Sequence, residues 1–250
     1  MPKPATEKQD INKLTLIICG LLVVAAFLIG MLYTKVQYLE KGGQADTGKN
    51  IANKEAPPNE PTQAVVNVPK VTDQDHVRGD RKARIALIEY SDLECPFCKK
   101  FHPTAQQALD AYKGQLMWVY RHFPLAFHQN AHKESEASEC VAALGGNDAF
   151  WKYIDAIYER TTANGTGFAL DKLAPLAVEV GVNQAKFTEC FDKGTYAKKV
   201  DDEMSGGSQA GVNGTPGNIL LDTKTGKTVV IPGAVPFEQL KLGIDSLLKG

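Results

Sequence analysis

Two cysteines three positions apart, Cys95 and Cys98, are the residues of this sequence whose type and spacing most clearly allow chemistry. On one turn of a helix such a pair can close a small disulfide and open it again by thiol exchange. Half of a zinc site and two structural thiols are the alternatives. A zinc site needs four ligands, and the chain has no second close pair of cysteines. The spacing therefore favours a redox-active pair.

The elements around this pair place it at a junction between a strand and a helix. Ile85–Ile88 is a short apolar run that predicts a buried strand, and after the pair apolar residues recur at helical spacing as far as Tyr112. A helix from about Cys95 to Tyr112 puts Cys95 at its N-terminus, where unpaired N–H groups and the helix dipole favour a thiolate. Pro96 falls in the first turn, where its missing N–H costs nothing. We expect Cys95 to be the exposed attacking thiol and Cys98 the more buried resolving thiol.

Three further motifs follow in order along the chain. They are Tyr-Arg-His-Phe-Pro-Leu at 120–125, Gly-Val-Asn-Gly-Thr-Pro-Gly-Asn at 211–218 and Ile-Pro-Gly-Ala-Val-Pro-Phe-Glu-Gln-Leu at 231–240. Together with Glu-Tyr-Ser-Asp-Leu-Glu-Cys-Pro-Phe-Cys at 89–98, they resemble the DsbA-like thiol-disulfide oxidoreductases of the thioredoxin superfamily, in particular the membrane-anchored bacterial type. The resemblance covers roughly residues 70–250 and does not extend to the first 70 residues.

The resemblance implies an α/β thioredoxin-like fold with an inserted helical domain, and the apolar pattern of the chain fits this fold. From about residue 128 to residue 209 the pattern is wholly helical, and Gly145-Gly146 divides its first two helices. Apolar runs on either side predict a βαβ unit and a ββα unit. These are strands at Ile85–Ile88, Leu116–Tyr120, Ile219–Asp222 and Thr228–Ile231, and a terminal helix from Pro236 to Leu248. We also expect an edge strand at Val65–Val71 and a turn near Arg78-Gly-Asp80.

The resemblance also implies where substrate binds. Thr215-Pro216 resembles the cis-proline site of the family, whose loop faces the two cysteines. A cis bond there would turn the chain so that backbone groups of Thr215 can pair with an extended substrate beside Cys95. Pro96 and Phe97, between the cysteines, are expected to contact the same substrate.

Two glutamates precede the cysteine pair. Glu89 lies six residues before Cys95, where the family commonly has a buried acid that can relay the proton of Cys98. A surface carboxylate is the alternative, although the adjoining apolar run favours burial. Glu94, immediately before Cys95, is expected to be exposed and to disfavour the thiolate modestly.

The remaining candidate ligands are cysteines and histidines of the helical stretch. Cys140 and Cys190 both lie on apolar helix faces and could meet. A disulfide there would close a loop of about 50 residues and contribute roughly 4 kcal/mol, whereas two buried free thiols would pack as small hydrophobes. We predict the disulfide. His128 and His132 have a spacing that could bind metal on a helix, but the pattern demands no nearby carboxylate or third ligand, so we predict no metal site.

The first 64 residues predict a membrane anchor and a tether. Residues 14–34 contain no charged side chain, and as a helix they would span about 31 Å, enough to cross a bilayer. A cleaved signal peptide is the alternative, but its apolar region is usually shorter, and no small-x-small site follows before Lys35. We expect residues 1–13 in the cytoplasm, a transmembrane helix at 14–34, a flexible linker at 35–64 and the folded domain at 65–250.

These features together predict an extracytoplasmic enzyme that introduces disulfides into secreted or surface proteins. The net charge of −1 gives no argument for a nucleic-acid partner. The resemblance implies reduced or misoxidised proteins as substrates, no bound cofactor, and a membrane redox partner of the DsbB or vitamin K epoxide reductase type. A reductase or isomerase of the same fold is an alternative, because Pro-Phe between the cysteines does not fix the potential. Another is a membrane-tethered chaperone or binding module without redox turnover.

Overall fold

A six-stranded mixed sheet organises the part of the chain that the computed structural model describes, residues 62–63, 66–163 and 167–249. Its strand order is β1-β6-β5-β3-β4-β2. The central strands β3 and β4 run parallel, and the other neighbours pair antiparallel. The strands are β1 (Thr62–Gln63), β2 (His76–Gly79), β3 (Ile85–Ser91), β4 (Leu116–His122), β5 (Gly217–Asp222) and β6 (Thr228–Pro232).

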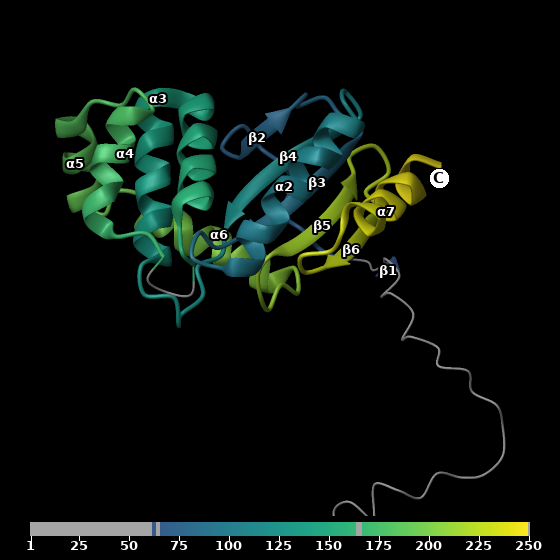
Figure 1. The fold of residues 1–250 in the computed structure, drawn as a ribbon. Helices are drawn as coiled ribbons and strands as arrows, with labels where there is room; N and C mark the ends of the chain where they lie inside the picture. The colour runs from purple at the N-terminus through teal and green to yellow at the C-terminus, as the bar shows by residue number, and fades with distance from the viewer. Residues whose placement is uncertain (1–61, 64–65, 164–166, 250) are drawn as a thin grey trace, which may run out of the picture. The chain divides into compact units, whose positions relative to one another are not determined.

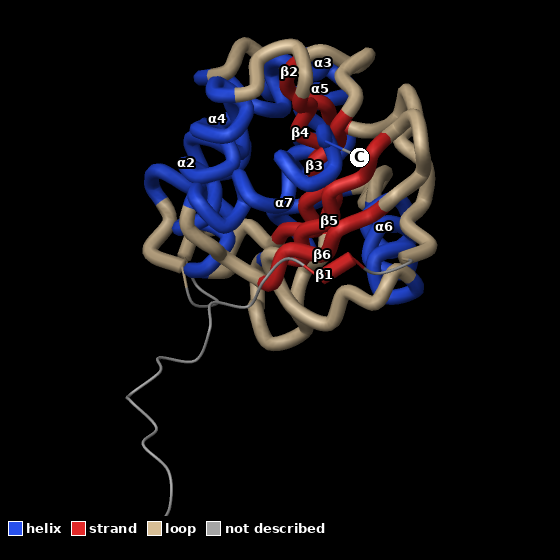
Figure 2. The backbone as a smooth tube through the Cα atoms, turned by 90° about the vertical axis from the view of Figure 1, so that its right-hand side faces the viewer, coloured by secondary structure: helices blue, strands red, loops and turns tan. Residues whose placement is uncertain are grey.

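Helices cover both faces of this sheet, which explains why β3 and β4 are buried along their whole length. On one face, α2 (Pro96–Ala111) and α7 (Phe237–Lys249) pack against Ile85 and Leu87 of β3. On the other face, α6 (Ala197–Gln209) lies close to Tyr90 of β3. Figure 2 shows α2 and α7 on one side of the strands and α6 on the other.

The helical insertion stands beside the edge of the sheet formed by β2 (Figure 1). It contains α3 (Ala131–Arg160), η1 (Leu170–Lys172), α4 (Leu173–Glu179) and α5 (Gln184–Asp192). The backbone of α3 breaks at Gly146, whose φ of 81° and ψ of −177° suit glycine alone. His76 contacts both Glu139 and Phe150, which would lie about 16 Å apart on a straight helix. The two halves of α3 therefore lie side by side, divided where Gly145-Gly146 predicts.

The expectation of an edge strand at the start of the domain is wrong, and the turn expected near Arg78-Gly-Asp80 is present but begins at Asp80. Residues 66–71 form no strand, although their valines pack with Ala86 and Ile88 on the α6 face of the sheet. The segment thus covers a face of the sheet without forming one of its strands. Arg78 and Gly79 belong to strand β2, which pairs with β4, and the turn begins one residue later, where Ala83 N–H donates to Asp80 O.

The predicted membrane anchor at 14–34 and the N-terminal segment 1–13 lie outside the described residues, as does the predicted linker at 35–64 apart from β1. Within residues 62–63, 66–163 and 167–249, no helix combines the length and the apolar character that a membrane span requires.

Candidate active site

Cys95 and Cys98 lie at the junction between strand β3 and helix α2, as the sequence predicts. Cys95 is the residue that precedes the first helical turn, with extended backbone angles, and Pro96 opens the helix. Both cysteines are free thiols. Cys98 is fully buried and Cys95 is 3% exposed, so the expectation of an exposed Cys95 is wrong. The carbonyl oxygen of Thr215 lies 3.4 Å from the Cys95 sulfur and accepts a hydrogen bond from it when Cys95 is a thiol.

The two thiols have opposite acidities. A hydrogen bond from Cys98 lowers the pKa of Cys95 to about 6, and the backbone N–H groups of Cys98 and Phe97 act in the same direction, against burial. Burial raises the pKa of Cys98 well above its ordinary value, and its neighbours Cys95 and Glu89 raise it further. At neutral pH, Cys95 is therefore largely a thiolate and Cys98 a thiol, which suits an attacking and a resolving cysteine.

Glu89 lies beneath the pair because of the two-residue period of β3. Ile85 and Leu87 pack in the core with α2, so Glu89 and Ser91 share that face of the strand. The Glu89 carboxylate is fully buried and accepts hydrogen bonds from Ser91 Oγ at 2.7 Å and Trp118 Nε1 at 2.9 Å. Burial raises its pKa to about 7. A carboxyl group with this pKa can both accept and return a proton at neutral pH.

The loop before β5 completes the site. The peptide bond between Thr215 and Pro216 is cis, and the hydrogen bond between Cys95 and Thr215 O places this loop against the cysteine pair. Pro216 is buried, whereas Phe97 is 61% exposed. The structure thus brings together the cysteines and the loop that sequence analysis assigned to substrate, with an aromatic side chain open to solvent beside them.

Glu94 is fully buried, so the expectation that it is exposed is wrong. Its two carboxylate oxygens accept hydrogen bonds from the backbone N–H groups of Asn130, at 2.9 Å, and Gly167, at 3.1 Å. Asp92 is also buried and accepts from the N–H of Glu94 at 2.8 Å. An Asp two residues before Glu94 is a local turn signal, but nothing in the sequence marks N–H groups 36 and 73 residues away as its partners.

The histidine pair that could have bound metal is divided between separate partners. His128 Nδ1 lies 2.8 Å from Asp92 Oδ2, and His132 contacts Glu136 and Asp201. The two rings therefore serve different contacts, and the structure gives no reason to join them in one metal site.

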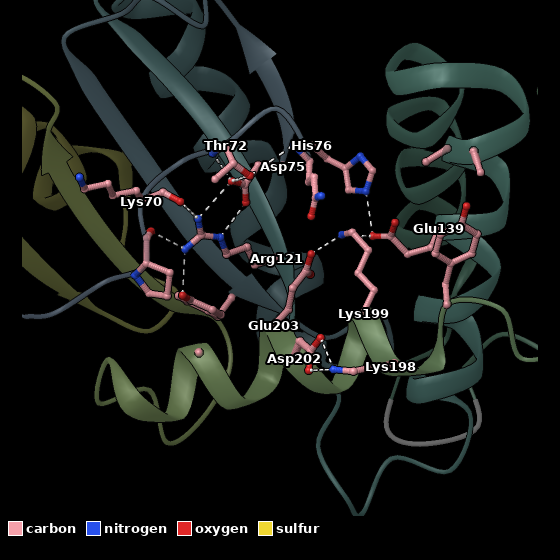
Figure 3. Close-up of a pocket in the computed structure, with 17 residues that line it drawn as sticks. Lys70, Thr72, Asp75, His76, Arg121, Glu139, Lys198, Lys199, Asp202 and Glu203 are labelled. Carbon is pink, nitrogen blue, oxygen red and sulfur yellow. Dashed lines mark hydrogen bonds and ion pairs between the residues drawn. The ribbon is translucent and has the colours of Figure 1, made fainter.

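A different polar cluster lies in a cavity of about 660 Å³ beside α6 (Figure 3). Glu139 and Glu203 line this cavity. One ligand atom from each of them and one from the buried His122, which is not part of the lining, all lie within 4.8 Å of one another. Sequence analysis missed this group because its members come from β4, α3 and α6. The Lys199 ammonium binds both carboxylates, at 2.8 Å in the case of Glu139. The positive charge between these acids is thus supplied by the protein itself.

Cys140 of α3 and Cys190 of α5 are joined by a disulfide, with an S–S distance of 1.98 Å. The bond lies in the helical insertion and leaves Cys95 and Cys98 as the free thiols of the described residues. It therefore ties the insertion together without taking part in the candidate site.

Comparison with known proteins gives a consistent result. The family described as Thioredoxin matches residues 71–236. The crystal structure of Pseudomonas aeruginosa DsbA2 is 30% identical, with a TM-score of 0.62, and the match covers 72% of this chain and 98% of that one. Oxidised BdbD from Bacillus subtilis is 23% identical, with a TM-score of 0.63 and coverage of 76% and 100%. Because its identity is low, this second likeness speaks for the fold alone.

Curated relatives with similar sequences are Na(+)/H(+) antiporters. NhaA 1 of Salinispora arenicola is 31% identical over 150 residues, and NhaA 3 of Salinispora tropica is 30% identical over 155 residues. The alignment covers 60% of this chain in each case but 22% of the antiporter. The chain thus spans about a fifth of the length of these relatives, and the likeness concerns one segment of them.

Proposed function

The chain belongs to the thioredoxin family as a DsbA-like thiol-disulfide oxidoreductase, and from this premise we propose that it introduces disulfides into secreted or surface proteins through Cys95 and Cys98. The observation that carries this proposal is the contrast between the two thiols. The pKa of Cys95 is lowered to about 6, and that of the fully buried Cys98 is raised. A pair built in this way has one sulfur suited to exchange with substrate and one suited to close the internal disulfide.

The reaction follows from these roles. A substrate thiolate attacks Cys95 Sγ of the internal disulfide, the bond between Cys95 and Cys98 breaks, and Cys98 leaves as a thiolate that takes up a proton. A second substrate thiolate then attacks the substrate sulfur of the mixed disulfide, and Cys95 leaves as a thiolate. The substrate dithiol is oxidised to a disulfide and the cysteine pair is reduced. Glu89 lies where it can supply the proton that Cys98 needs.

The direction of this exchange depends on which form of the pair the protein stabilises. A low pKa of Cys95 stabilises the reduced form, in which Cys95 is a thiolate, and so makes the disulfide form a stronger oxidant. This argument favours net oxidation of substrates over their reduction.

Substrate would bind beside Cys95, against the Thr215–Pro216 loop and the exposed Phe97, with Pro96 at the start of the helix beneath it. Backbone groups of Thr215 would pair with an extended segment of the substrate. The apolar run at 14–34 would anchor the chain in the cell membrane with the catalytic domain outside. A membrane partner of the DsbB or vitamin K epoxide reductase type would reoxidise the cysteine pair, with no bound cofactor on this chain.

The experiment that tests this function uses the oxidised full chain and a reduced secreted protein with one native disulfide. The wild type should form that disulfide in the substrate, Cys95→Ser should abolish the activity, and Cys98→Ser should accumulate mixed disulfides at Cys95. A variant with both Cys140→Ser and Cys190→Ser serves as the control, because it removes the other disulfide and should stay active.

The reduction potential decides between oxidant and reductase. Equilibration of the Cys95–Cys98 pair in a series of glutathione buffers should give a potential well above that of thioredoxin, about −270 mV. A value at or below this would reject net oxidation and favour a reductase of the same fold. If neither Cys95→Ser nor Cys98→Ser formed a mixed disulfide with the substrate, the result would instead favour a chaperone or binding module.

A further inference from the structure

A set of buried hydroxyl groups lies between Cys98 and Glu89. Ser91 Oγ donates a hydrogen bond to Glu89 Oε1 at 2.7 Å and lies 2.8 Å from the Tyr158 hydroxyl. The same serine lies near the Cys98 thiol, whose pKa it lowers. Glu89, Ser91 and Cys98 are fully buried, and Tyr158 is 3% exposed. These buried groups therefore offer a path for a proton that leaves or reaches Cys98.

The geometry of Glu89 makes Ser91 the natural bridge. The hydrogen bonds of the Glu89 carboxylate come from Ser91 and Trp118, so the serine is the group that joins this acid to the thiol. Trp118 has a donor nitrogen only and cannot pass a proton on. A serine hydroxyl can accept one proton while giving up its own, which is what a relay requires.

We propose that Ser91 Oγ carries the proton between Cys98 and Glu89 during disulfide exchange, and that Tyr158 positions Ser91 for this transfer. The inference rests on the function proposed above. When a mixed disulfide has formed at Cys95, the Cys98 thiol gives its proton to Ser91 Oγ as Ser91 gives its own to the Glu89 carboxylate. The Cys98 thiolate attacks Cys95 Sγ, the bond between the two cysteines forms, and the bond from Cys95 to the external sulfur breaks with departure of a thiolate. The cysteine pair is oxidised and the external sulfur is reduced.

The role of Tyr158 follows from the hydroxyl protons. Ser91 has one proton, which it donates to Glu89, so the hydrogen bond between Ser91 and Tyr158 must be donated by the tyrosine. That bond occupies one of the two acceptor positions of Ser91 Oγ and leaves the other for the Cys98 thiol. When Ser91 turns its proton toward Cys98 in the reverse reaction, Tyr158 has a second acceptor in the carbonyl oxygen of Asp92, at 3.3 Å.

The pH dependence of the transfer should reflect Glu89. The titratable groups that face Glu89 and Ser91 come from three elements: Cys95 and Cys98 at the start of α2, Tyr120 from β4 and Tyr158 from α3, with His102 of α2 packed on Trp118 and Tyr158. In the mixed disulfide Cys95 no longer titrates. Glu89 is the group that accepts the proton, so resolution should accelerate as Glu89 ionises, and Glu89→Gln should remove that acceleration.

The test separates the two steps of exchange in the reduced full chain. The protein is mixed with excess glutathione disulfide, quenched at successive times, and its mixed disulfide and internal disulfide are counted by mass spectrometry. Ser91→Ala should slow resolution by Cys98 at least tenfold at pH 7, since positioned proton transfer contributes about 10²–10⁴-fold. Formation of the mixed disulfide, which uses Cys95 alone, should stay within about twofold of the wild-type rate. In Ser91→Ala, the inflection near or below pH 7 in the pH profile of the resolution rate should disappear, as it should in Glu89→Gln.

Tyr158→Phe should slow the same step less than Ser91→Ala, because the serine hydroxyl remains. Two matched controls should leave both steps unchanged. Tyr153→Phe removes another buried hydroxyl from α3, one that donates to Leu173 O, and Ser135→Ala removes a buried serine hydroxyl that donates to Ala131 O.

Three results would overturn the relay. First, Ser91→Ala could resolve the mixed disulfide at the wild-type rate and with the wild-type pH profile. This result would overturn the relay and leave the proposed function intact. An equal loss in formation and resolution would mean that Ser91 only supports the fold. Absence of a mixed disulfide at Cys95 in the wild type would overturn the relay together with the proposed function.

Discussion

Glu134 of α3 is a buried carboxyl group without a hydrogen-bond partner among the described residues. Burial raises its pKa to about 9, and the charges of Glu94 and Asp92 raise it further. Glu89, which accepts two hydrogen bonds, is shifted only to about 7. Two equally buried acids thus differ by their partners, and Glu134 stays protonated under conditions in which Glu89 exchanges its proton.

Glu134→Gln should flatten the pH dependence of stability between pH 7 and pH 9. Because the pKa of Glu134 in the folded state is raised from 4.5 to about 9, its stabilisation is complete below 4.5 and is lost as pH rises through 9. The wild type should therefore lose stability relative to the variant by up to about 1.4 kcal/mol for each pH unit. Denaturant unfolding of the oxidised protein, in which the active-site thiols do not titrate, measures this difference.

The exposed Glu189 of α5 provides the control, since Glu189→Gln removes a carboxyl group whose pKa is not raised. It should leave the slope between pH 7 and pH 9 as in the wild type. If the free energies of unfolding of the wild type and Glu134→Gln changed in parallel with pH, the result would contradict a neutral carboxyl group at this position.

The connection between β3 and α2 does more than carry the cysteines, because the Glu94 carboxylate also binds two backbone N–H groups from distant parts of the chain. One is the N–H of Asn130, immediately before α3, and the other is the N–H of Gly167. Both are charge-assisted hydrogen bonds in a buried setting, each worth about 1.5–3 kcal/mol. The acid next to Cys95 therefore fixes parts of the helical insertion against the redox helix.

Glu94→Ala should release these two backbone groups. We expect the amide hydrogens of Asn130 and Gly167 to exchange with solvent faster, and the free energy of unfolding to fall by about 3 kcal/mol, because two buried donors lose their acceptor. Hydrogen exchange resolved to single amides measures the first effect and denaturant unfolding the second. Asp201→Ala, on the exposed side of α6, should change neither, and unaltered exchange in Glu94→Ala would show that the carboxylate does not hold these segments.

The elements were predictable wherever the pattern of side chains reports burial directly. The apolar runs of β3 and β4 and the helical spacing after Cys95 placed the frame correctly, and Gly145-Gly146 marked the break in α3. Residues 66–71 were predicted wrongly because closely spaced valines indicate only that one side of an extended segment is covered. Whether its backbone joins a sheet depends on the edge available, and here the segment lies across a face of the sheet instead.

The candidate site was predictable in its chemistry but less so in its surroundings. The spacing of Cys95 and Cys98 and the position of Glu89 on the strand are local features of the sequence. Cys95 contacts Thr215, and Glu94 accepts from the N–H groups of Asn130 and Gly167, across separations of 36 to 120 residues. No local pattern of residue types encodes such partners.

At the scale of the molecule, the site is shared between the frame and the insertion. The cysteines and Glu89 come from β3 and α2, Thr215 from the loop before β5, and Tyr158 from the second half of α3. The hydrogen bond between Tyr158 and Ser91 and those of Glu94 to backbone N–H groups join the two parts around the redox pair. Oxidation or reduction of the cysteine pair should therefore change the stability of the whole domain.

Two opposing terms decide whether the reduced or the oxidised domain is more stable. The disulfide between Cys95 and Cys98 closes a loop of four residues, for which the chain-entropy estimate is about 2 kcal/mol in favour of the oxidised form. The reduced form gains from the Cys95 thiolate, whose pKa is lowered from 9.0 to about 6. This stabilisation is present above pH 9 and is lost as pH falls through 6. Its full value is up to about 4 kcal/mol.

The reduced form should therefore unfold at the higher temperature at pH 8 and above, and the oxidised form at pH 6. From pH 6 to pH 9 the difference in unfolding free energy should move in favour of the reduced form by roughly 3 kcal/mol, because Cys95 is a thiolate in the folded chain over this range and still a thiol in the unfolded chain. Calorimetry of the two forms across this range measures the change, and reduced Cys95→Ser should lack the rise seen in the reduced wild type. An oxidised form that stays the more stable at pH 9 would mean that the thiolate is not stabilised, and the argument for net oxidation would fail with it.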